Sequence, residues 1–169
     1  MIIVYTSETG HTKQYAKILS DATNLPYYTL NEVPEQHKGS DVIYLGWLFA
    51  NSIKGLENAR RKYNVRAVIA SGMSPDTPEL ETLLKAKAKL PGSVPFFYVQ
   101  GGYDYNKLKG LNHFLMSIQN KRILKRYDDK SEEEKQSDTV YKMFTEGYSA
   151  VSEENLKPAI EWTKSQLGK

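Results

Sequence analysis

The stretch MIIVYTSETGHT, residues 1–12, decides the fold of this chain. Residues 2–5 form an uninterrupted apolar run rich in β-branched side chains, which is typical of a central parallel strand covered on both faces. From Tyr15 onward, apolar side chains recur at helical spacing, at Tyr15, Ile18, Leu19 and Ala22. The pattern predicts a buried strand, a tight turn and a helix.

The predicted turn is rich in groups that can donate hydrogen bonds. It contains Ser7, Glu8, Thr9, Gly10, His11 and Thr12. The first turn of a helix has free N–H groups and the positive end of the helix dipole, so it can hold an anion such as phosphate. The hydroxyls of Ser7, Thr9 and Thr12 would add three donors. The alternative is an ordinary capped turn between strand and helix, because Ser and Thr are favoured N-caps with or without a ligand.

Further strands and helices alternate along the chain. Four more apolar runs, at residues 26–30, 41–46, 66–70 and 94–99, predict strands. Helices are expected from near Ile53, from Pro78 after the cap Thr77, and over residues 152–167. This alternation predicts an α/β fold, with a parallel sheet and helices on both faces.

Composition narrows the class of protein. The length of 169 residues suits one domain, residues 1–169, and 25% charged residues with 40% hydrophobic residues are typical of a globular protein. The chain has no cysteine, which excludes disulfides, thiolate metal sites and cysteine nucleophiles. A formal charge of +3 gives no reason to expect a nucleic-acid partner. Without a basic leader or an apolar run near the ~20 residues of a membrane span, we expect a cytoplasmic protein.

Three unusual loops follow predicted strands, at residues 7–12, 47–52 and 72–76. In an open parallel sheet, ligands bind outside the carboxyl ends of the strands, where the strand order reverses. If the strand order is 2-1-3-4-5, that place lies between the first and third strands. We therefore expect the three loops to form one ligand site.

Residues 7–12 resemble the Thr/Ser-x-Thr-Gly-x-Thr phosphate loop of the flavodoxin family, and they stand at the family's position, directly after the amino-terminal strand. The resemblance covers the element order of the whole chain. It implies a flavodoxin-like three-layer sandwich, with a five-stranded parallel sheet in the order 2-1-3-4-5, and FMN as the cofactor. Residues 7–12 would surround the FMN phosphate, with Glu8 and His11 acting mainly through their backbone N–H groups.

The resemblance also implies two loops beside the isoalloxazine ring. One would contain Trp47, Leu48, Phe49, Ala50 and Asn51, and the other Gly72, Met73, Ser74 and Asp76. The second loop lacks the aromatic residue that commonly stacks on the flavin there, so Trp47 or Phe49 is expected to stack instead. The alternative for Trp47 is core packing at the end of a strand. The slightly basic charge is a second departure, because electron-shuttling flavodoxins are usually acidic.

A long segment, residues 103–150, separates the fifth strand from the last helix. It resembles the extension of the flavodoxin-like, menaquinone-dependent protoporphyrinogen oxidase subfamily. Within it, residues 106–126 predict a helix with Leu108, Leu111, Leu115, Ile118 and Ile123 on one side. The basic residues of segment 107–126 are Lys107, Lys109, Lys121, Arg122, Lys125 and Arg126. Such a helix would contact an anionic membrane surface or a partner, or alternatively pack on its own sheet with a solvated basic side.

Other common chemistries have no motif in the sequence. The three histidines are far apart, and neither a Gly-x-Ser-x-Gly elbow nor a Gly-x-x-x-x-Gly-Lys-Ser/Thr loop is present. No metal site, hydrolase or NTPase is therefore expected. In the oxidoreductase interpretation the flavin does the electron chemistry, and the protein supplies no acid, base or nucleophile.

The expected function is therefore electron transfer or oxidoreduction by an FMN-binding protein, with a redox partner protein or a quinone as partner. One alternative is a quinone-coupled enzyme similar to protoporphyrinogen dehydrogenase. A second is a flavin-free interaction or signalling domain on the same fold. A receiver domain would need a phosphorylatable aspartate at the end of the first strand, where Thr6, Ser7 and Glu8 stand instead.

Overall fold

A computed structural model describes residues 1–168, and Lys169, the last residue of the predicted domain, lies outside them. The chain divides into two compact units. Unit 1 contains Met1–Gly101 and the chain from Ala150 onward, and unit 2 contains Gly102–Ser149. Unit 2 covers the long segment that the sequence places after the fifth strand. That the whole chain forms a single domain stays a prediction.

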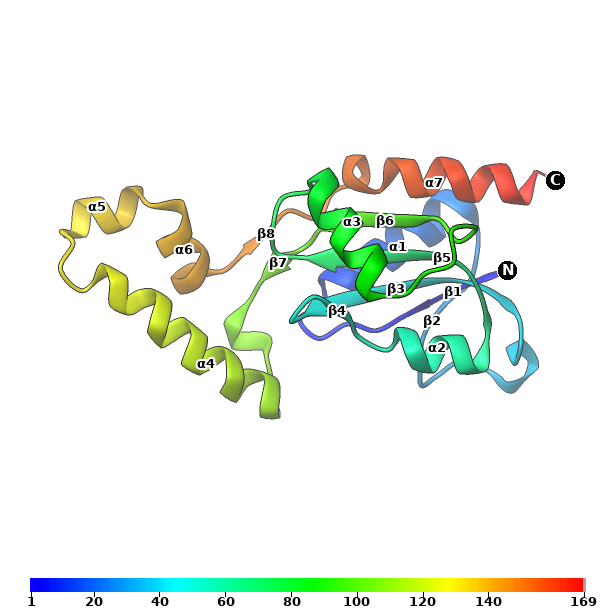
Figure 1. The fold of residues 1–169 in the computed structure, drawn as a ribbon, viewed down its shortest axis with the longest axis horizontal. Coiled ribbons are helices and arrows are strands. Elements are labelled where there is room, and N and C mark those ends of the chain that lie inside the picture. Colours follow the sequence, from blue (N-terminus) through cyan, green and yellow to red (C-terminus); the bar gives the residue numbers. More distant parts are fainter. Residues whose placement is uncertain (169) are drawn as a thin grey trace. The chain divides into compact units, whose positions relative to one another are not determined.

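Unit 1 is built on a mostly parallel sheet (Figure 1). Its parallel strands are β1 (Ile2–Tyr5), β2 (Tyr27–Thr29), β3 (Asp41–Phe49), β5 (Asn64–Gly72) and β6 (Phe96–Gln100). They lie in the order β2-β1-β3-β5-β6, which is the flavodoxin-like order and confirms the predicted fold class. The predicted count of five strands was short by one, because β4 (Ser52–Ile53) pairs antiparallel with the end of β3.

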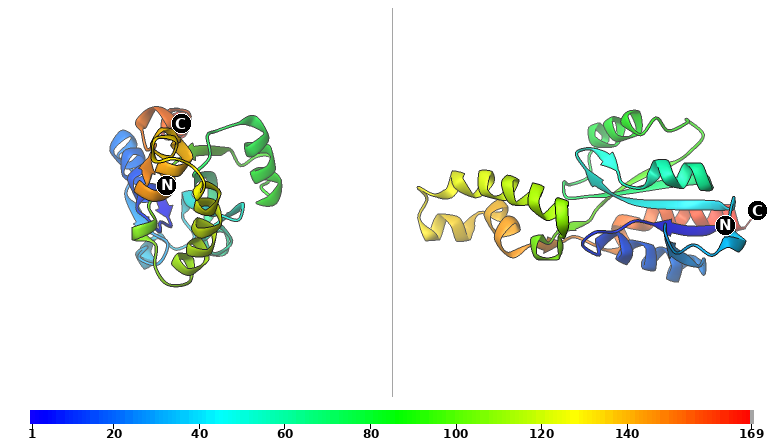
Figure 2. Two further views of the ribbon diagram at one scale, coloured as in Figure 1. Left: turned by 90° about the vertical axis from the view of Figure 1, so that its left-hand side faces the viewer. Right: turned by 90° about the horizontal axis from the view of Figure 1, so that it is seen from below.

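Helices cover both faces of this sheet (Figures 1 and 2). The helices α1 (His11–Thr23) and α7 (Glu153–Leu167) pack on one face, and α2 (Leu56–Lys62) and α3 (Pro78–Lys87) on the other. Because side chains alternate along a strand, Ile3 and Ile43 face α1 while Val4 and Val42 face the opposite layer. Burial on both faces explains why the strands read as continuous apolar runs.

Local signals in the sequence set the helix ends in unit 1. The hydroxyl of Thr77 accepts a hydrogen bond from the Leu80 N–H, and Ser152 caps α7 in the same way. Pro158 lies inside α7, which begins at Glu153. The helix expected from near Ile53 begins instead at Leu56, because β4 occupies the preceding residues. A short 3₁₀ turn, Glu35–His37, lies between β2 and β3.

Unit 2 is mainly helical. It contains β7 (Gly102–Tyr103), α4 (Gly110–Leu124), α5 (Glu132–Ser137), α6 (Thr139–Glu146) and β8 (Tyr148–Ser149), with 3₁₀ turns at Tyr105–Lys107 and Lys125–Tyr127. The strands β7 and β8 pair antiparallel. Tyr103 packs its ring near Phe144 and donates its hydroxyl to Asn120 Oδ1 at 2.5 Å. Burial of this hydroxyl raises the pKa of Tyr103 to about 12.

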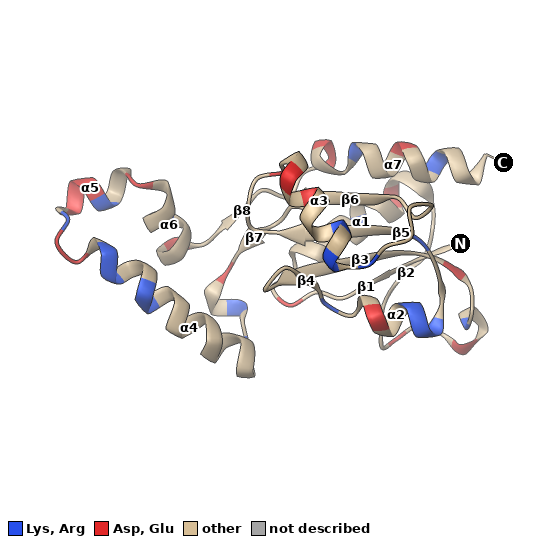
Figure 3. Cartoon of the chain, viewed as in Figure 1, with Lys and Arg blue, Asp and Glu red and all other residues tan. Residues whose placement is uncertain are grey.

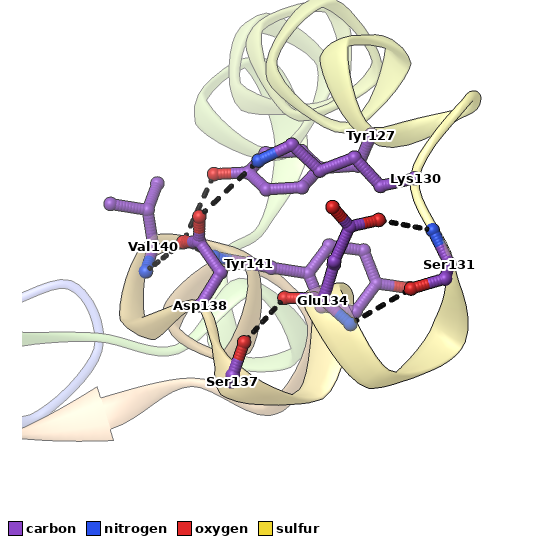
Figure 4. A network of polar contacts seen from close by, with 8 residues as sticks. All are labelled: Tyr127, Lys130, Ser131, Glu134, Ser137, Asp138, Val140 and Tyr141. Atoms are coloured by element: carbon purple, nitrogen blue, oxygen red, sulfur yellow. Dashed lines mark hydrogen bonds and ion pairs between the residues drawn. The ribbon is translucent and has the colours of Figure 1, made fainter.

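The polar stretch after α4 forms a capped helix pair (Figure 4). Ser131 caps α5 in a capping box with Glu134, and each residue bonds the backbone N–H of the other. Asp138 caps α6 by accepting from the N–H groups of Val140 and Tyr141, and it also accepts from the Tyr127 hydroxyl at 3.1 Å. These caps explain how so polar a sequence forms two short helices.

Of the two alternatives for the apolar side of α4, the packed side was wrong. Leu111, Leu115 and Ile118, which the sequence places on one side of the helix, are exposed. Leu108 is buried but precedes the helix, and the buried residue of the helix itself is Asn120.

Across residues 1–168, no helix is long and apolar enough to cross a membrane.

Candidate functional site

The turn between β1 and α1 has the backbone that the phosphate-loop prediction needs. Gly10 adopts φ 100°, a left-handed conformation that favours glycine, and it immediately precedes α1. A Cβ placed on Gly10 would meet no atom within 4 Å, so the space beside the turn is open. The first turn of α1 contains no acidic residue. An anion would therefore find room and the positive end of the helix dipole at this position.

The side chains of this turn already bond within it. The hydroxyl oxygen of Ser7 accepts from the N–H of Gly10 at 3.2 Å and from the N–H of Lys13 at 3.3 Å. Thr9 Oγ1 lies 2.9 Å from Nδ1 of His11. Ser7 thus satisfies two N–H groups of the turn without a ligand, while the N-cap itself is Gly10 and supplies no side-chain cap. The two hydrogen bonds to the Ser7 hydroxyl are long for N–H···O bonds, so this hydroxyl is a weak acceptor. An incoming phosphate oxygen would replace it as the acceptor for the N–H groups of Gly10 and Lys13.

The predicted loop at residues 47–51 is largely a strand. β3 continues through Trp47, Leu48 and Phe49, because large aromatic and aliphatic residues favour strands. Ala50 and Asn51 then turn the chain with φ of 49° and 60°, as in a two-residue hairpin, and Leu48 pairs with Ile53 in β4. The segment is therefore a β-hairpin that extends the sheet beyond its carboxyl edge.

Trp47 and Phe49 form an aromatic pair on this hairpin. Being two residues apart in a strand, they share one face, and their rings meet edge-on with centroids 5.9 Å apart. The Lys54 ammonium lies 5.8 Å from the Trp47 ring and 5.2 Å from the Phe49 ring. Both aromatic residues are only half-buried, so Trp47 is not a core residue. A planar ring could stack here on the accessible part of the two aromatic side chains.

Polar contacts fasten the base of the hairpin to β1 and β3. The carbonyl oxygen of Lys54 accepts from the hydroxyls of Tyr44, at 2.5 Å, and Thr6, at 2.8 Å. Burial raises the pKa of Tyr44 far above its ordinary value, so its hydroxyl keeps its proton. Thr6, Tyr44 and Lys54 were not predicted as residues of the site. The only signal for them was the position of Thr6 directly before the phosphate-loop motif.

The third predicted loop, residues 72–76, lies against both neighbouring strands. Gly72 is so close to Leu48 that a Cβ on it would lie 2.9 Å from Leu48 Cδ1. The Tyr98 hydroxyl donates to the Ser74 carbonyl at 2.6 Å, and the Gln100 amide donates to the Met73 carbonyl at 3.1 Å. These bonds from β6 hold the loop beside the hairpin. Within it, Ser74 and Asp76 are exposed and Met73 is half-buried.

The phosphate-loop turn adjoins the ends of β5 and β6 through Gly101. A Cβ on Gly101 would overlap the Ser71 hydroxyl and lie 3.5 Å from the His11 Cβ. Ser71 in turn pairs with Trp47 in the sheet register. The structure thus brings the three predicted segments to one edge of the sheet. The roles of their individual residues toward a ligand stay predictions.

The opposite edge of the sheet has a different hollow. A cavity of about 290 Å³ is lined by residues from the amino ends of β5 and β6 and from α7, including Asn64, Arg66 and Trp162. It lies at the end of the strands away from the three loops.

Within residues 1–168, no group of three or more His, Cys, Asp or Glu side chains is arranged to hold a metal ion.

No protein-family model and no curated protein matches the sequence. Among solved structures, one neighbour is a flavodoxin from the domain Archaea, with 16% sequence identity and a TM-score of 0.37, covering 59% of this chain and 83% of its own. Another is a protein from Bacteroides uniformis described as a flavoprotein, with 15% identity and a TM-score of 0.40, covering 59% of this chain and 89% of its own. Likeness at this level does not inform the chemistry of the site.

Proposed function

We propose that this chain binds FMN at the carboxyl edge of its sheet and acts in electron transfer or oxidoreduction. One observation supports the proposal above the others. The open helix start at Gly10, the aromatic hairpin at residues 47–53 and the loop at residues 72–76 meet where the strand order reverses, between β1 and β3. That is the position at which open α/β sheets bind their ligands.

Each part of the site has a distinct role in this proposal. The N–H groups of Gly10 and Lys13 would bind the phosphate once it replaces the Ser7 hydroxyl, and Thr9 would add a hydroxyl donor. The half-buried pair of Trp47 and Phe49 would supply a flat apolar surface for the ring. The bound flavin supplies electron and hydride chemistry, while the protein positions it and limits the access of solvent.

The partner distinguishes two versions of the proposal. An electron carrier would exchange electrons with a redox partner protein, whereas a quinone-coupled dehydrogenase would take them from a small organic donor. The absence of an acidic overall charge favours the second version, because the chain has a formal charge of +3. A flavin-free signalling domain is disfavoured, because no aspartate follows β1.

Titration of the flavin-free protein with FMN and with riboflavin tests the proposal. If the turn at residues 7–12 holds the phosphate, FMN binds much more tightly than riboflavin, which lacks this group. In Thr9→Asp a carboxylate faces the phosphate, and a like-charge contact of this kind costs several kcal/mol, so FMN affinity should fall by roughly a hundredfold or more. Riboflavin affinity should change little.

Thr77→Asp is the matched control. It makes the same substitution at the N-cap of α3, where Asp is also a good cap, so it should leave both affinities unchanged. FMN binding that is absent in the unmodified protein, or equal in Thr9→Asp and Thr77→Asp, would refute the phosphate assignment. Flavin fluorescence quenching measures both affinities.

A further inference from the structure

The helix α4 carries a stripe of exposed apolar side chains. The exposed fractions are 70% for Leu111, 60% for Phe114, 38% for Leu115 and 52% for Ile118. Their spacing of three and four residues places them on one face of the helix. Single exposed apolar residues are common on protein surfaces, but four on neighbouring helical turns form a contiguous patch.

This stripe is not the packing side of α4 within unit 2. The buried residue of the helix is Asn120, whose side-chain oxygen accepts a hydrogen bond from Tyr103. Ile123 and Leu124 are half-buried. On a helical wheel these three residues lie on the other side from Leu111 and Ile118. The helix therefore packs on its own unit with one side and presents apolar residues with the other.

The same face continues into a cluster of positive charge. Lys121, Arg122 and Lys125 follow Ile118 by three, four and seven residues, so they extend the stripe toward the carboxyl end of α4. Figure 3 shows Lys and Arg in this half of the helix and none in the other half. All three are exposed, and none forms an ion pair with a residue in the part of the chain that the structure describes. No acidic residue occurs between residues 105 and 127.

From this combination we infer that α4 docks on an anionic lipid bilayer. Apolar side chains on one helix face insert at the boundary between headgroups and acyl chains, and lysine and arginine bind the lipid phosphates. The long stems of Lys121 and Arg122 can lie along the apolar region while their charges reach the headgroups. The inference rests on residues of unit 2 alone, so it does not depend on FMN binding.

Charge favours a bilayer over a second copy of the chain. In a symmetric contact between two α4 stripes, no acidic residue of either helix would neutralise the α4 cations, because residues 105–127 contain none. Two of the acidic residues of α5 already have partners, since Glu132 pairs with Lys135 and Glu134 bonds Ser131. An anionic bilayer, by contrast, presents negative charge over a wide area and can attract Lys121, Arg122 and Lys125 at the same time.

Co-sedimentation of the full chain with lipid vesicles tests the inference. Vesicles containing phosphatidylglycerol should bind the protein at 0.1 M salt, and vesicles of phosphatidylcholine alone should bind it at least tenfold less. Binding should also fall at 1 M salt, where the screening length shrinks from about 10 Å to about 3 Å. Binding that is equal for the two lipids, or absent, would overturn the inference.

Two variants of α4 separate its apolar and cationic parts. Lys121→Glu combined with Arg122→Glu should lower the partition coefficient by roughly thirtyfold or more, because each cation near an anionic surface contributes about fivefold. Leu111→Ser should lower it severalfold by removing an exposed apolar anchor. Circular dichroism should show unchanged helix content in both variants, since the substituted side chains are exposed.

Matched substitutions on α3 provide the controls. Lys85→Glu combined with Lys87→Glu makes the same charge change at exposed positions, and Leu83→Ser removes an exposed leucine. These controls should bind vesicles like the unmodified protein. If they lose binding as much as the α4 variants do, net charge or general hydrophobicity is responsible and α4 is not the docking surface. A dimer in light scattering that Leu111→Ser dissociates, without vesicle binding, would assign the stripe to a second copy and overturn the inference.

Discussion

Gly55 shows at the scale of one residue how the hairpin is joined to the sheet. It adopts φ +80°, and a Cβ on it would overlap the Tyr44 hydroxyl and lie 2.6 Å from Thr6 Cγ2. Gly39 adopts a similar φ of +74° with nothing near its Cβ position. Substitution by another residue would strain the backbone at both glycines. Only at Gly55 would the new side chain also clash with neighbouring atoms.

Gly55→Ala should lower the free energy of unfolding by about 2–4 kcal/mol, from backbone strain together with overpacking. Gly39→Ala should lower it by only about 1 kcal/mol, from strain alone. Urea unfolding followed by circular dichroism measures both. Equal losses in the two variants would mean that Gly55 is not closely packed against Tyr44 and Thr6.

Single residues of the site were predictable to different degrees. The turn around Gly10 was found because its backbone demand is local and leaves a mark in the sequence. Thr6 and Tyr44 were missed, because each acts through a carbonyl oxygen far away in the chain, that of Lys54. No spacing along the sequence encodes a contact of that kind. The proposed roles of Trp47 and Phe49 stay predictions.

At the scale of elements, the cap of α6 links stability to pH. The Tyr141 N–H above all, and then the Tyr127 hydroxyl and the Val140 N–H, lower the pKa of Asp138 below its ordinary value. A lowered pKa in the folded state means that the ionised cap stabilises the protein above the ordinary pKa of aspartate. This stabilisation is lost as the pH falls through the lower, folded-state pKa.

Asp138→Ala should therefore destabilise the protein clearly at pH 7, and its difference from the unmodified protein should shrink as the pH falls from about 4 toward 2. Thermal unfolding followed by circular dichroism at several pH values gives this difference. Asp129→Ala, which removes an exposed aspartate from the same stretch, serves as the control and should show little effect. A difference that stays constant with pH would contradict the capping role of the carboxylate.

Periodicity predicted the existence of the main elements and failed at their limits. The strands of the sheet were predicted because burial on both faces gives uninterrupted apolar runs. The end of β3 was placed too early, at Gly46, although Trp47 to Phe49 are strand-forming residues. In α4 the spacing identified an apolar side correctly, but whether that side is buried depends on neighbours that the sequence of one helix does not show.

At the scale of the whole molecule, the two units differ in how much apolar surface they bury. Only four of the buried apolar side chains lie in unit 2, namely Tyr103, Leu108, Tyr127 and Phe144. The sheet of unit 1 has a continuous core on each face. Local opening is easier where few apolar side chains are buried.

Amide hydrogen exchange should therefore be slowest in β1, β3 and β5 and faster, by at least tenfold, in α4, α5 and α6. Mass spectrometry of peptides from the exchanged protein measures this difference. Protection of α4 equal to that of β3 would contradict it. The alternation of strands and helices predicted a parallel sheet with helices on both faces, and the resemblance to flavodoxins implied its strand order, whereas the separate packing of residues 102–149 left no comparable pattern.

The two crossings between the units lie next to each other. The Ala150 N–H donates to the Gly101 carbonyl at 2.7 Å, and β7 pairs with β8 directly beyond. The chain thus leaves unit 1 and returns to it at almost the same point. The hydrogen bond between Gly101 and Ala150 and the pairing of β7 with β8 hold the two ends of residues 102–149 together, which closes the loop that these residues form. Residues 102–149 therefore form an insertion that could be replaced as a whole. A tight turn, or a different module with adjacent termini, could be grafted between Gly101 and Ala150 without altering the register of the sheet.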